Sequence, residues 1–150
     1  MFFFTKAPSQ SSLFNEKTFY SQFLKDMEMA QKEVIIECPY ITASRMEMFY
    51  PLFQRLLNKK IRIKIITRDP SEHDDDYIKH QSTNEILKSK ERGVDITLLK
   101  GHHHRKLAII DQKILWEGSL NILSQNNSKE IMRRTESKEQ ANQVIKFISS

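Results

Sequence analysis

The sequence predicts an α/β protein, namely an α/β/α sandwich around a mixed central sheet of about six strands. Short runs of β-branched and aliphatic residues recur along the chain, and stretches with apolar residues at helical spacing separate most of them. The chain has 150 residues, of which 39% are hydrophobic, and it contains only 3 Gly and 4 Pro. This length and composition fit one globular domain that buries a sizeable core.

The chain divides into a segment over 1–14, which we interpret as an N-terminal segment or linker, and a single domain over 15–150. Pro8 and the Ser9–Ser12 run favour a loop at the end of the first segment. The Phe2–Phe4 cluster has no evident partner in the sequence. It would either add an edge strand or pack on something outside this chain.

The first element of the domain is predicted to be a helix. Asn15 is expected to cap it, and the helix is expected to run to Gln31. Phe19, Phe23 and Met27 recur at the spacing of one helical face. This face is therefore expected to pack on the sheet.

A buried strand over 34–38 and a helix over 44–58 are expected next. Tyr40 follows the carboxyl end of the strand, where open α/β sheets usually hold their site, so it either lines that site or packs in the core. Pro51 marks the point where the helix either begins or is kinked. The helical stripe consists of Phe49, Leu52, Phe53, Leu56 and Leu57.

The remaining elements are predicted on the same grounds. Ile61, Ile63 and Ile65 alternate with two basic residues, which indicates a strand with one apolar and one basic face. Further strands are expected over 94–99, 106–110, 113–116 and 130–133, and helices over 78–92, ended by Gly93, and after a Ser137 cap.

The composition limits the function classes. The balance of 24 Lys+Arg against 19 Asp+Glu gives a net charge of +5, a moderate positive field that favours polyanions. The single cysteine, Cys38, excludes an internal disulfide and suits a reducing compartment, so we expect a cytoplasmic protein. Because no basic signal region and no long apolar run occurs, stable membrane association is not expected.

The stretch from His104 to Asn121 carries most of the residue types that phosphate chemistry needs. His104 and Lys106 are two apart on a predicted strand, so their side chains leave the same face roughly 7 Å apart and can touch one phosphate together. Gly118-Ser119 breaks the following strand, and 120–124 could open a helical turn whose free N–H groups would face an anion.

These residues resemble a known motif. His104, Lys106 and Asp111 match His-x-Lys-x4-Asp, and Gly118, Ser119 and Asn121 match the Gly-Ser-x-Asn that follows it. The pattern resembles the HKD motif of the phospholipase D superfamily, in a form with one motif per chain. The resemblance implies the phospholipase-D-like fold, and phosphodiester chemistry through a histidine nucleophile, without a metal or other cofactor.

The resemblance also implies roles for individual residues. His104 would be the nucleophile, Lys106 would bind and neutralise phosphate, and Ser119 and Asn121 would donate hydrogen bonds to phosphate or to an opposing subunit. Asp111 and Glu130 are the candidate catalytic carboxylates. Glu130 is the better candidate for orienting His104, because members of the family carry an acid on the strand after Gly-Ser-x-Asn. Strand parity places Asp111 on the face opposite His104 unless the turn redirects it, which favours a structural or interface salt bridge. The second catalytic histidine would come from a second subunit, which implies a homodimer.

Several alternatives remain at this stage. His102–His104 could instead be a solvated loop or a weak metal site. The favoured function is a metal-independent nuclease acting on DNA or RNA. The alternative is a phospholipase-D-like module that binds nucleic acid without cutting it, as part of a larger machine such as a helicase. Lipid hydrolysis or phosphatidyl transfer is disfavoured, because no amphipathic membrane-binding helix is evident.

Overall fold

The structure, a computed structural model, describes residues 10–150. Its central sheet has seven strands in the order β1-β7-β6-β5-β2-β3-β4. β2, β3 and β4 run parallel to one another, and every other neighbouring pair is antiparallel, so the sheet is mixed as predicted. The strands are β1 (Gln10–Asn15), β2 (Glu33–Cys38), β3 (Arg62–Arg68), β4 (Asp95–Leu99), β5 (Leu107–Ile110), β6 (Ile114–Gly118) and β7 (Ile131–Glu136).

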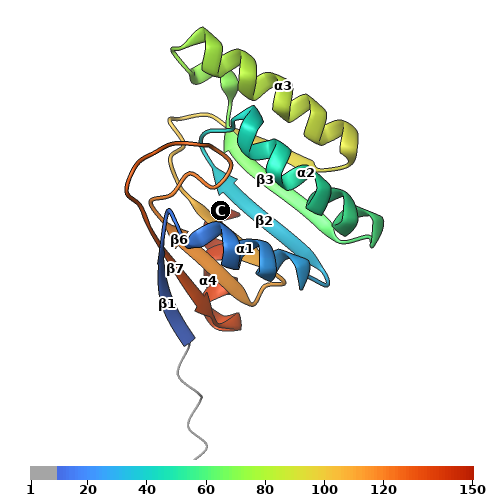
Figure 1. The fold of residues 1–150 in the computed structure, drawn as a ribbon, viewed down its shortest axis with the longest axis vertical. Helices are drawn as coiled ribbons and strands as arrows, with labels where there is room; N and C mark the ends of the chain where they lie inside the picture. The colour runs from blue at the N-terminus through green and yellow to red at the C-terminus, as the bar shows by residue number, and fades with distance from the viewer. Residues whose placement is uncertain (1–9) are drawn as a thin grey trace, which may run out of the picture.

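Helices cover both faces of the sheet, which gives the three layers of the predicted sandwich. α1 and α2 lie over one face and α4 lies behind the other (Figure 1). Buried residues of α1 and α2, together with Ile86 of α3, belong to the larger core cluster. A smaller cluster forms under α4 on the opposite face. The helices are α1 (Phe19–Glu28), α2 (Ala43–Asn58), α3 (Asp76–Arg92) and α4 (Lys138–Ile148), with a short 3-10 helix η1 (Pro70–Glu72).

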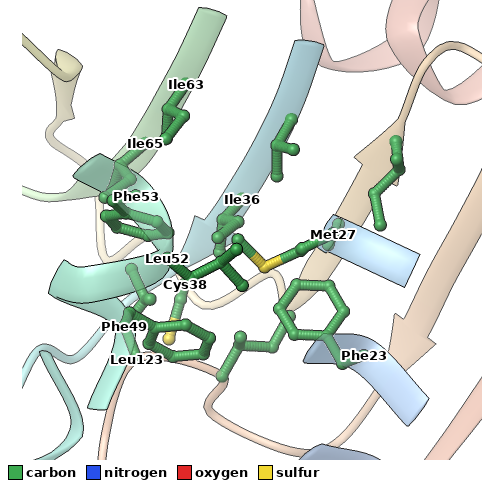
Figure 2. Close-up of a cluster of buried hydrophobic side chains, with 14 of the residues drawn as sticks. Phe23, Met27, Ile36, Cys38, Phe49, Leu52, Phe53, Ile63, Ile65 and Leu123 are labelled. Atoms are coloured by element: carbon green, nitrogen blue, oxygen red, sulfur yellow. The ribbon is translucent and has the colours of Figure 1, made fainter. Parts of the chain in front are cut away.

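The larger core follows from the strand alternation. Val34, Ile36 and Cys38 of β2 point toward α1 and α2, whereas Ile35 joins the cluster under α4. Figure 2 shows Phe23 and Met27 of α1 meeting Phe49 and Phe53 of α2 over Ile36. The helical stripes identified in the sequence are therefore core faces, as predicted.

One buried polar cluster fixes α1 against the sheet. Asp26 is buried and accepts hydrogen bonds from Trp116 Nε1 at 2.9 Å and from Arg134 Nε at 2.7 Å. A buried carboxylate needs such partners to offset its lost hydration. Asp26 thus joins the helix to β6 and β7.

The segment before residue 15 differs from the prediction. Gln10–Asn15, expected as the end of a linker, forms the edge strand β1, which pairs antiparallel with β7. The sheet therefore has seven strands rather than about six. The prediction was wrong here because the Ser-rich sequence has little strand propensity of its own, and the hydrogen bonds of β7 decide the conformation. The Phe2–Phe4 prediction lies outside the described residues.

The start of α1 also differs from the prediction. Asn15 ends β1, and its Oδ1 accepts hydrogen bonds from the backbone N–H groups of Lys17 and Thr18, so α1 begins only at Phe19. This local turn competes with the helix cap that the sequence suggested.

α2 runs through Pro51 without a break in the helix, so it does not begin at that residue. Gly93, by contrast, ends α3 in the left-handed conformation, with φ of 103°, as predicted.

The register of the sheet brings four loops to one edge. β2 ends where β5 begins, since Glu37 pairs with Leu107, and β6 ends where β7 begins, since Gly118 pairs with Met132. The loops that follow β2 and β3, the loop before β5 and the loop between β6 and β7 therefore meet at the carboxyl end of β2 (Figure 1). This edge carries the candidate site.

Candidate active site

His104 and Lys106 lie together in the loop that enters β5. Lys106 Nζ is 2.8 Å from His104 Nδ1 and 3.0 Å from the His104 carbonyl oxygen. The sequence predicted that the two side chains share a face, and the structure brings them into direct contact. His104 is exposed, and no hydrogen bond from residues 10–150 is assigned to its Nε2. The nitrogen that faces solvent is therefore Nε2.

Lys106 lies in a partly buried environment. Burial lowers the pKa of its ammonium group, while Cys38 and Glu130 act in the opposite direction by their negative charge when ionised. Since an ammonium group has donors but no acceptor, the contact makes Nδ1 of His104 the acceptor. A neutral His104 ring in this geometry carries its proton on Nε2.

Gly118 and Ser119 join the end of β6 to the start of β7. A Cβ on Gly118 would lie 2.1 Å from the Ile131 carbonyl oxygen, so only glycine fits there. The Ser119 hydroxyl accepts from the Ile131 N–H at 3.0 Å and lies 3.4 Å from the Ile131 carbonyl oxygen. Ser119 is exposed at the site edge, but its hydroxyl is already engaged with the backbone.

Asn121 follows in a single turn that does not continue as a helix. The Ser124 N–H donates to the Asn121 carbonyl oxygen at 3.1 Å, which closes this turn. The loop then docks on the start of α2, where Thr42 N–H donates to the Leu123 carbonyl oxygen at 3.0 Å. The side-chain oxygen of Asn121 is buried without a hydrogen-bond partner. Asn121 is thus held rigidly beside the motif with unused hydrogen-bonding capacity.

Glu130 lies immediately before β7 and on the same edge. Its charge raises the pKa of Lys106, which places the carboxylate near the site. The Glu130 carboxylate accepts a hydrogen bond from the Ser128 hydroxyl at 2.6 Å, and no hydrogen bond to His104 is formed. Glu130 therefore acts on Lys106 through its charge and makes no hydrogen bond to the imidazole ring.

Asp111 lies at the opposite edge of the sheet, at the far end of β5. Its carboxylate accepts hydrogen bonds from the backbone N–H groups of Gln31, Lys32 and Glu33 at 2.9, 2.8 and 3.1 Å. These bonds fix the turn between α1 and β2. Asp111 is not brought to His104, so we remove it from the candidate catalytic set. Its role is structural, through backbone amides rather than through a salt bridge.

Two aromatic residues at the site were not predicted with this arrangement. The Tyr40 ring stacks on His73, with centroids 5.3 Å apart, and meets the His104 ring edge-on at 6.4 Å. Tyr40 therefore lines the site, which was one of the two alternatives for it. His73 could not be assigned to the site from the sequence, because no local pattern shows that the 69–75 loop folds back onto Tyr40.

His103 points the other way from His104. It is buried, and its Nε2 lies 3.4 Å from Oε1 of Glu37, a fully buried carboxylate. Arg105 Nε donates to the same oxygen at 2.7 Å. The interpretation of His102–His104 as a solvated loop or a weak metal site is thus wrong for His103. Alternation along the chain places this side chain under the opposite face of the sheet.

These buried histidines should make stability depend on pH. Burial lowers the pKa of both His73 and His103, and nearby cations lower it further. Since the unfolded imidazoles bind a proton near pH 6.5 and the native ones resist it, stability is lost as the pH falls below that value. We expect a slope of at most about 1.4 kcal/mol per pH unit for each histidine.

Thermal or denaturant unfolding between pH 5 and 8 checks this expectation. Glu37 acts in the opposite direction, because burial raises its pKa. The histidine contribution is therefore the difference in the free energy of unfolding between the wild type and a variant that carries both His73→Gln and His103→Gln. The free energy of unfolding of this variant should depend less on pH. A matched His80→Gln variant on an exposed helix position should retain the wild-type profile. Identical profiles for all three proteins would contradict the expectation.

The comparisons with known proteins agree with this geometry. The family described as "Cardiolipin synthase, PLD-like domain" matches residues 23–150, and the chain therefore belongs to this phospholipase-D-like family. No sequence among the curated proteins matches the chain. No helix among residues 10–150 is long and apolar enough to cross a membrane.

Solved structures show the same fold. NucT from Helicobacter pylori is 24% identical, with a TM-score of 0.72 over 93% of this chain and 92% of that chain. The phospholipase D family member Nuc from Salmonella typhimurium is 12% identical, with a TM-score of 0.72 over 93% and 91%. The archaeal chromatin protein TrmBL2, whose structure shows a mode of DNA binding, is 10% identical, with a TM-score of 0.64 over 93% of this chain and 50% of that chain. At these identities the likeness shows the fold alone.

Proposed function

We propose that this protein is a metal-independent phosphodiesterase that acts on nucleic acid through a phosphohistidine intermediate on His104. The observation that supports the proposal most directly is the contact between Lys106 Nζ and His104 Nδ1, at an exposed edge of a phospholipase-D-like sheet. It places a fixed cation beside an imidazole whose second nitrogen faces solvent. This pair can bind a phosphate and attack it.

The first chemical step is attack by His104 Nε2 on phosphorus. A phosphodiester resists attack because its anionic oxygens repel nucleophiles, so the ammonium group of Lys106 must neutralise that charge. When the phosphate binds Lys106, the lysine releases Nδ1 of His104, and the ring proton moves to Nδ1. Nε2 then forms the P–N bond while the P–O bond to the leaving group breaks.

The resulting phosphohistidine carries positive charge on its ring, and a carboxylate stabilises such a ring. Glu130 is the candidate, since it lies on the same edge of the sheet and its charge already acts on Lys106. Water then attacks phosphorus, the P–N bond breaks and neutral His104 is restored. The side-chain N–H groups of Asn121 and the hydroxyl of Ser119 would donate hydrogen bonds to the bound phosphate or to the opposing subunit.

The departing oxygen needs a proton, and a single motif does not supply the acid. His73 and His103 are buried and hold lowered pKa values, so neither can serve as an exposed acid at this site. We propose that His104 of a second copy donates the proton across a shared pocket of a two-fold dimer. The same imidazole would then accept a proton from the attacking water.

Nucleic acid is the proposed substrate class. The net charge of +5 attracts polyanions, and the TrmBL2 structure associates the same fold with DNA binding. The family description names a lipid synthase, so the fold does not by itself select the substrate. Labelled single- and double-stranded DNA, compared with phospholipid vesicles at equal enzyme concentration, test the choice. Preferred turnover of the vesicles would contradict it.

Turnover of a generic diester, bis(p-nitrophenyl) phosphate, should survive a chelator. His104 and Lys106 supply the nucleophile and the charge that a metal ion would otherwise supply. EDTA is added at 5–10 mM, a concentration on the order of that used to strip protein-bound divalent ions. We expect the initial rates with EDTA to lie within about twofold of the rates without it. Activity that disappears in EDTA and returns on addition of magnesium or zinc would refute the metal-independent mechanism.

The second candidate function is a non-cleaving nucleic-acid-binding module, within a larger machine such as a helicase. The hydrogen bonds between the Ser119 hydroxyl and the Ile131 backbone favour this second function, because they leave the hydroxyl less available to bind a reacting phosphate. Binding and cleavage of the same labelled DNA distinguish the two functions. Salt-dependent binding without any product, at enzyme concentrations above the binding midpoint, would favour the module.

A further inference from the structure

We propose that Glu37 is a positioning residue for the nucleophile, holding the loop that carries His104 and Lys106 from the reverse face of the sheet through its ion pair with Arg105. The inference rests on the proposed function, since it assigns His104 as the nucleophile. It concerns a carboxylate on β2 that makes no contact with the reacting atoms.

The loop over 102–106 needs an anchor, because it lies outside the sheet. Regular strand pairing of β5 begins only at Leu107. One backbone bond reaches the end of the loop, from the Gly118 N–H to the Lys106 carbonyl oxygen at 3.3 Å. The start of the loop is held by Glu72, which accepts from the Gly101 N–H at 2.9 Å. His104 itself is exposed, so its position depends on its neighbours in the chain.

Alternation along the loop gives those neighbours opposite directions. Lys106 alternates with Ala108 and Ile110 of β5, which belong to the core under α1 and α2. Arg105 lies on the α4 side, where its guanidinium carbon is 5.6 Å from the Phe147 ring centroid. His104 and Lys106 therefore project from one face of this short segment. The reverse-face residues, His103 and Arg105, project from the other.

Glu37 lies beside both reverse-face residues and binds Arg105. Its side chain is fully buried, and its Oε1 lies 2.7 Å from Arg105 Nε and 3.4 Å from His103 Nε2. Because Glu37 pairs with Leu107 in the sheet, this oxygen sits directly beside the point where the loop joins β5. This oxygen thus binds Arg105, the residue after His104, and lies against His103, whose Nε2 makes no hydrogen bond within residues 10–150.

Stability alone does not explain a carboxylate at this position. The second oxygen, Oε2, is buried without a hydrogen-bond partner, and burial raises the pKa of the group. Removing one partner of a buried ion pair is destabilising when it leaves the other charge buried and unpaired. Arg105 is 41% exposed, so it can return to water if Glu37 is neutralised. Mutation of Glu37 should therefore lower turnover without lowering the stability of the fold.

Glu37→Gln removes the charge and keeps the size, and Glu37→Leu removes all polar capacity. The matched control is Glu33→Gln, on the same strand and the same face but at the far end, where its carboxylate meets Arg62 at 3.5 Å and Gln112 at 2.8 Å. Three quantities are measured on the full chain: kcat and KM for bis(p-nitrophenyl) phosphate in EDTA, the thermal midpoint, and the ¹⁵N spectrum of the histidine rings.

For both Glu37 variants we expect kcat to fall about 10- to 100-fold with KM within about twofold, because a small misplacement of a reacting group costs this much. The thermal midpoint should not fall. The wild-type spectrum should show His104 protonated on Nε2, and both Glu37 variants should shift toward the tautomer mixture of a free imidazole. Glu33→Gln should match the wild type in all three measurements.

Unchanged kcat in the Glu37 variants, or an equal loss in Glu33→Gln, would overturn the inference. A fall in kcat that only follows a lowered thermal midpoint in both Glu37 variants would overturn it as well. If the wild type has no turnover, the proposed function fails, and the histidine spectra alone decide the positioning role. An altered His104 signal in the Glu37 variants then supports it, and an unaltered signal refutes it.

Discussion

His104→Ala should abolish phosphodiester turnover while the protein remains folded. The substitution removes the only imidazole among the described residues that combines exposure, contact with Lys106 and a solvent-facing nitrogen. We expect a loss of about 10³-fold or more, because no other group can form the covalent intermediate. The measurement is kcat on bis(p-nitrophenyl) phosphate and on labelled DNA, with the thermal midpoint recorded beside it.

The control for this variant is His80→Ala. His80 is also exposed, and its ring contacts only Asn84, one turn away on α3. Turnover within about twofold of the wild type is expected for it, as for most surface substitutions away from special features. Equal losses in His80→Ala and His104→Ala, or full activity in His104→Ala, would show that the nucleophile has been assigned wrongly.

Excess His104→Ala protein should suppress the activity of wild-type chains. In the proposed dimer each pocket needs one His104 to attack phosphorus and another to protonate the leaving oxygen, so a mixed dimer is inactive. With a tenfold excess of His104→Ala protein and free exchange of subunits, a wild-type chain pairs with another wild-type chain about one time in eleven. The activity should therefore fall roughly tenfold.

Excess His80→Ala provides the matched control, because it leaves both imidazoles of the shared pocket in place. The total activity should then rise with added protein rather than fall. Light scattering over the same concentrations establishes the assembly state. A strictly monomeric protein with full activity, or wild-type activity that is insensitive to His104→Ala at concentrations where a dimer is present, would contradict the shared site.

Much of the fold could be predicted from the sequence because its strongest signals are local. The apolar stripe of α1, the Gly93 helix end and the Ser137 cap each follow from periodicity or from one residue's backbone preference. β1 could not be predicted in this way. Its six residues are almost all exposed, and they adopt a strand only because β7 offers hydrogen-bonding partners.

The sequence by itself determined the motif, since His104 and Lys106 lie two residues apart and alternation along an extended chain places them on one face. It also determined that Gly118 and Asn121 follow at the matching distance. Only the tertiary structure decided which other residues join them. Glu37 and Tyr40 reach the site because β2 pairs with β5, and Asp111 leaves it because its strand runs to the opposite edge of the sheet. Such contacts depend on strand order and direction, which no spacing within a single segment encodes.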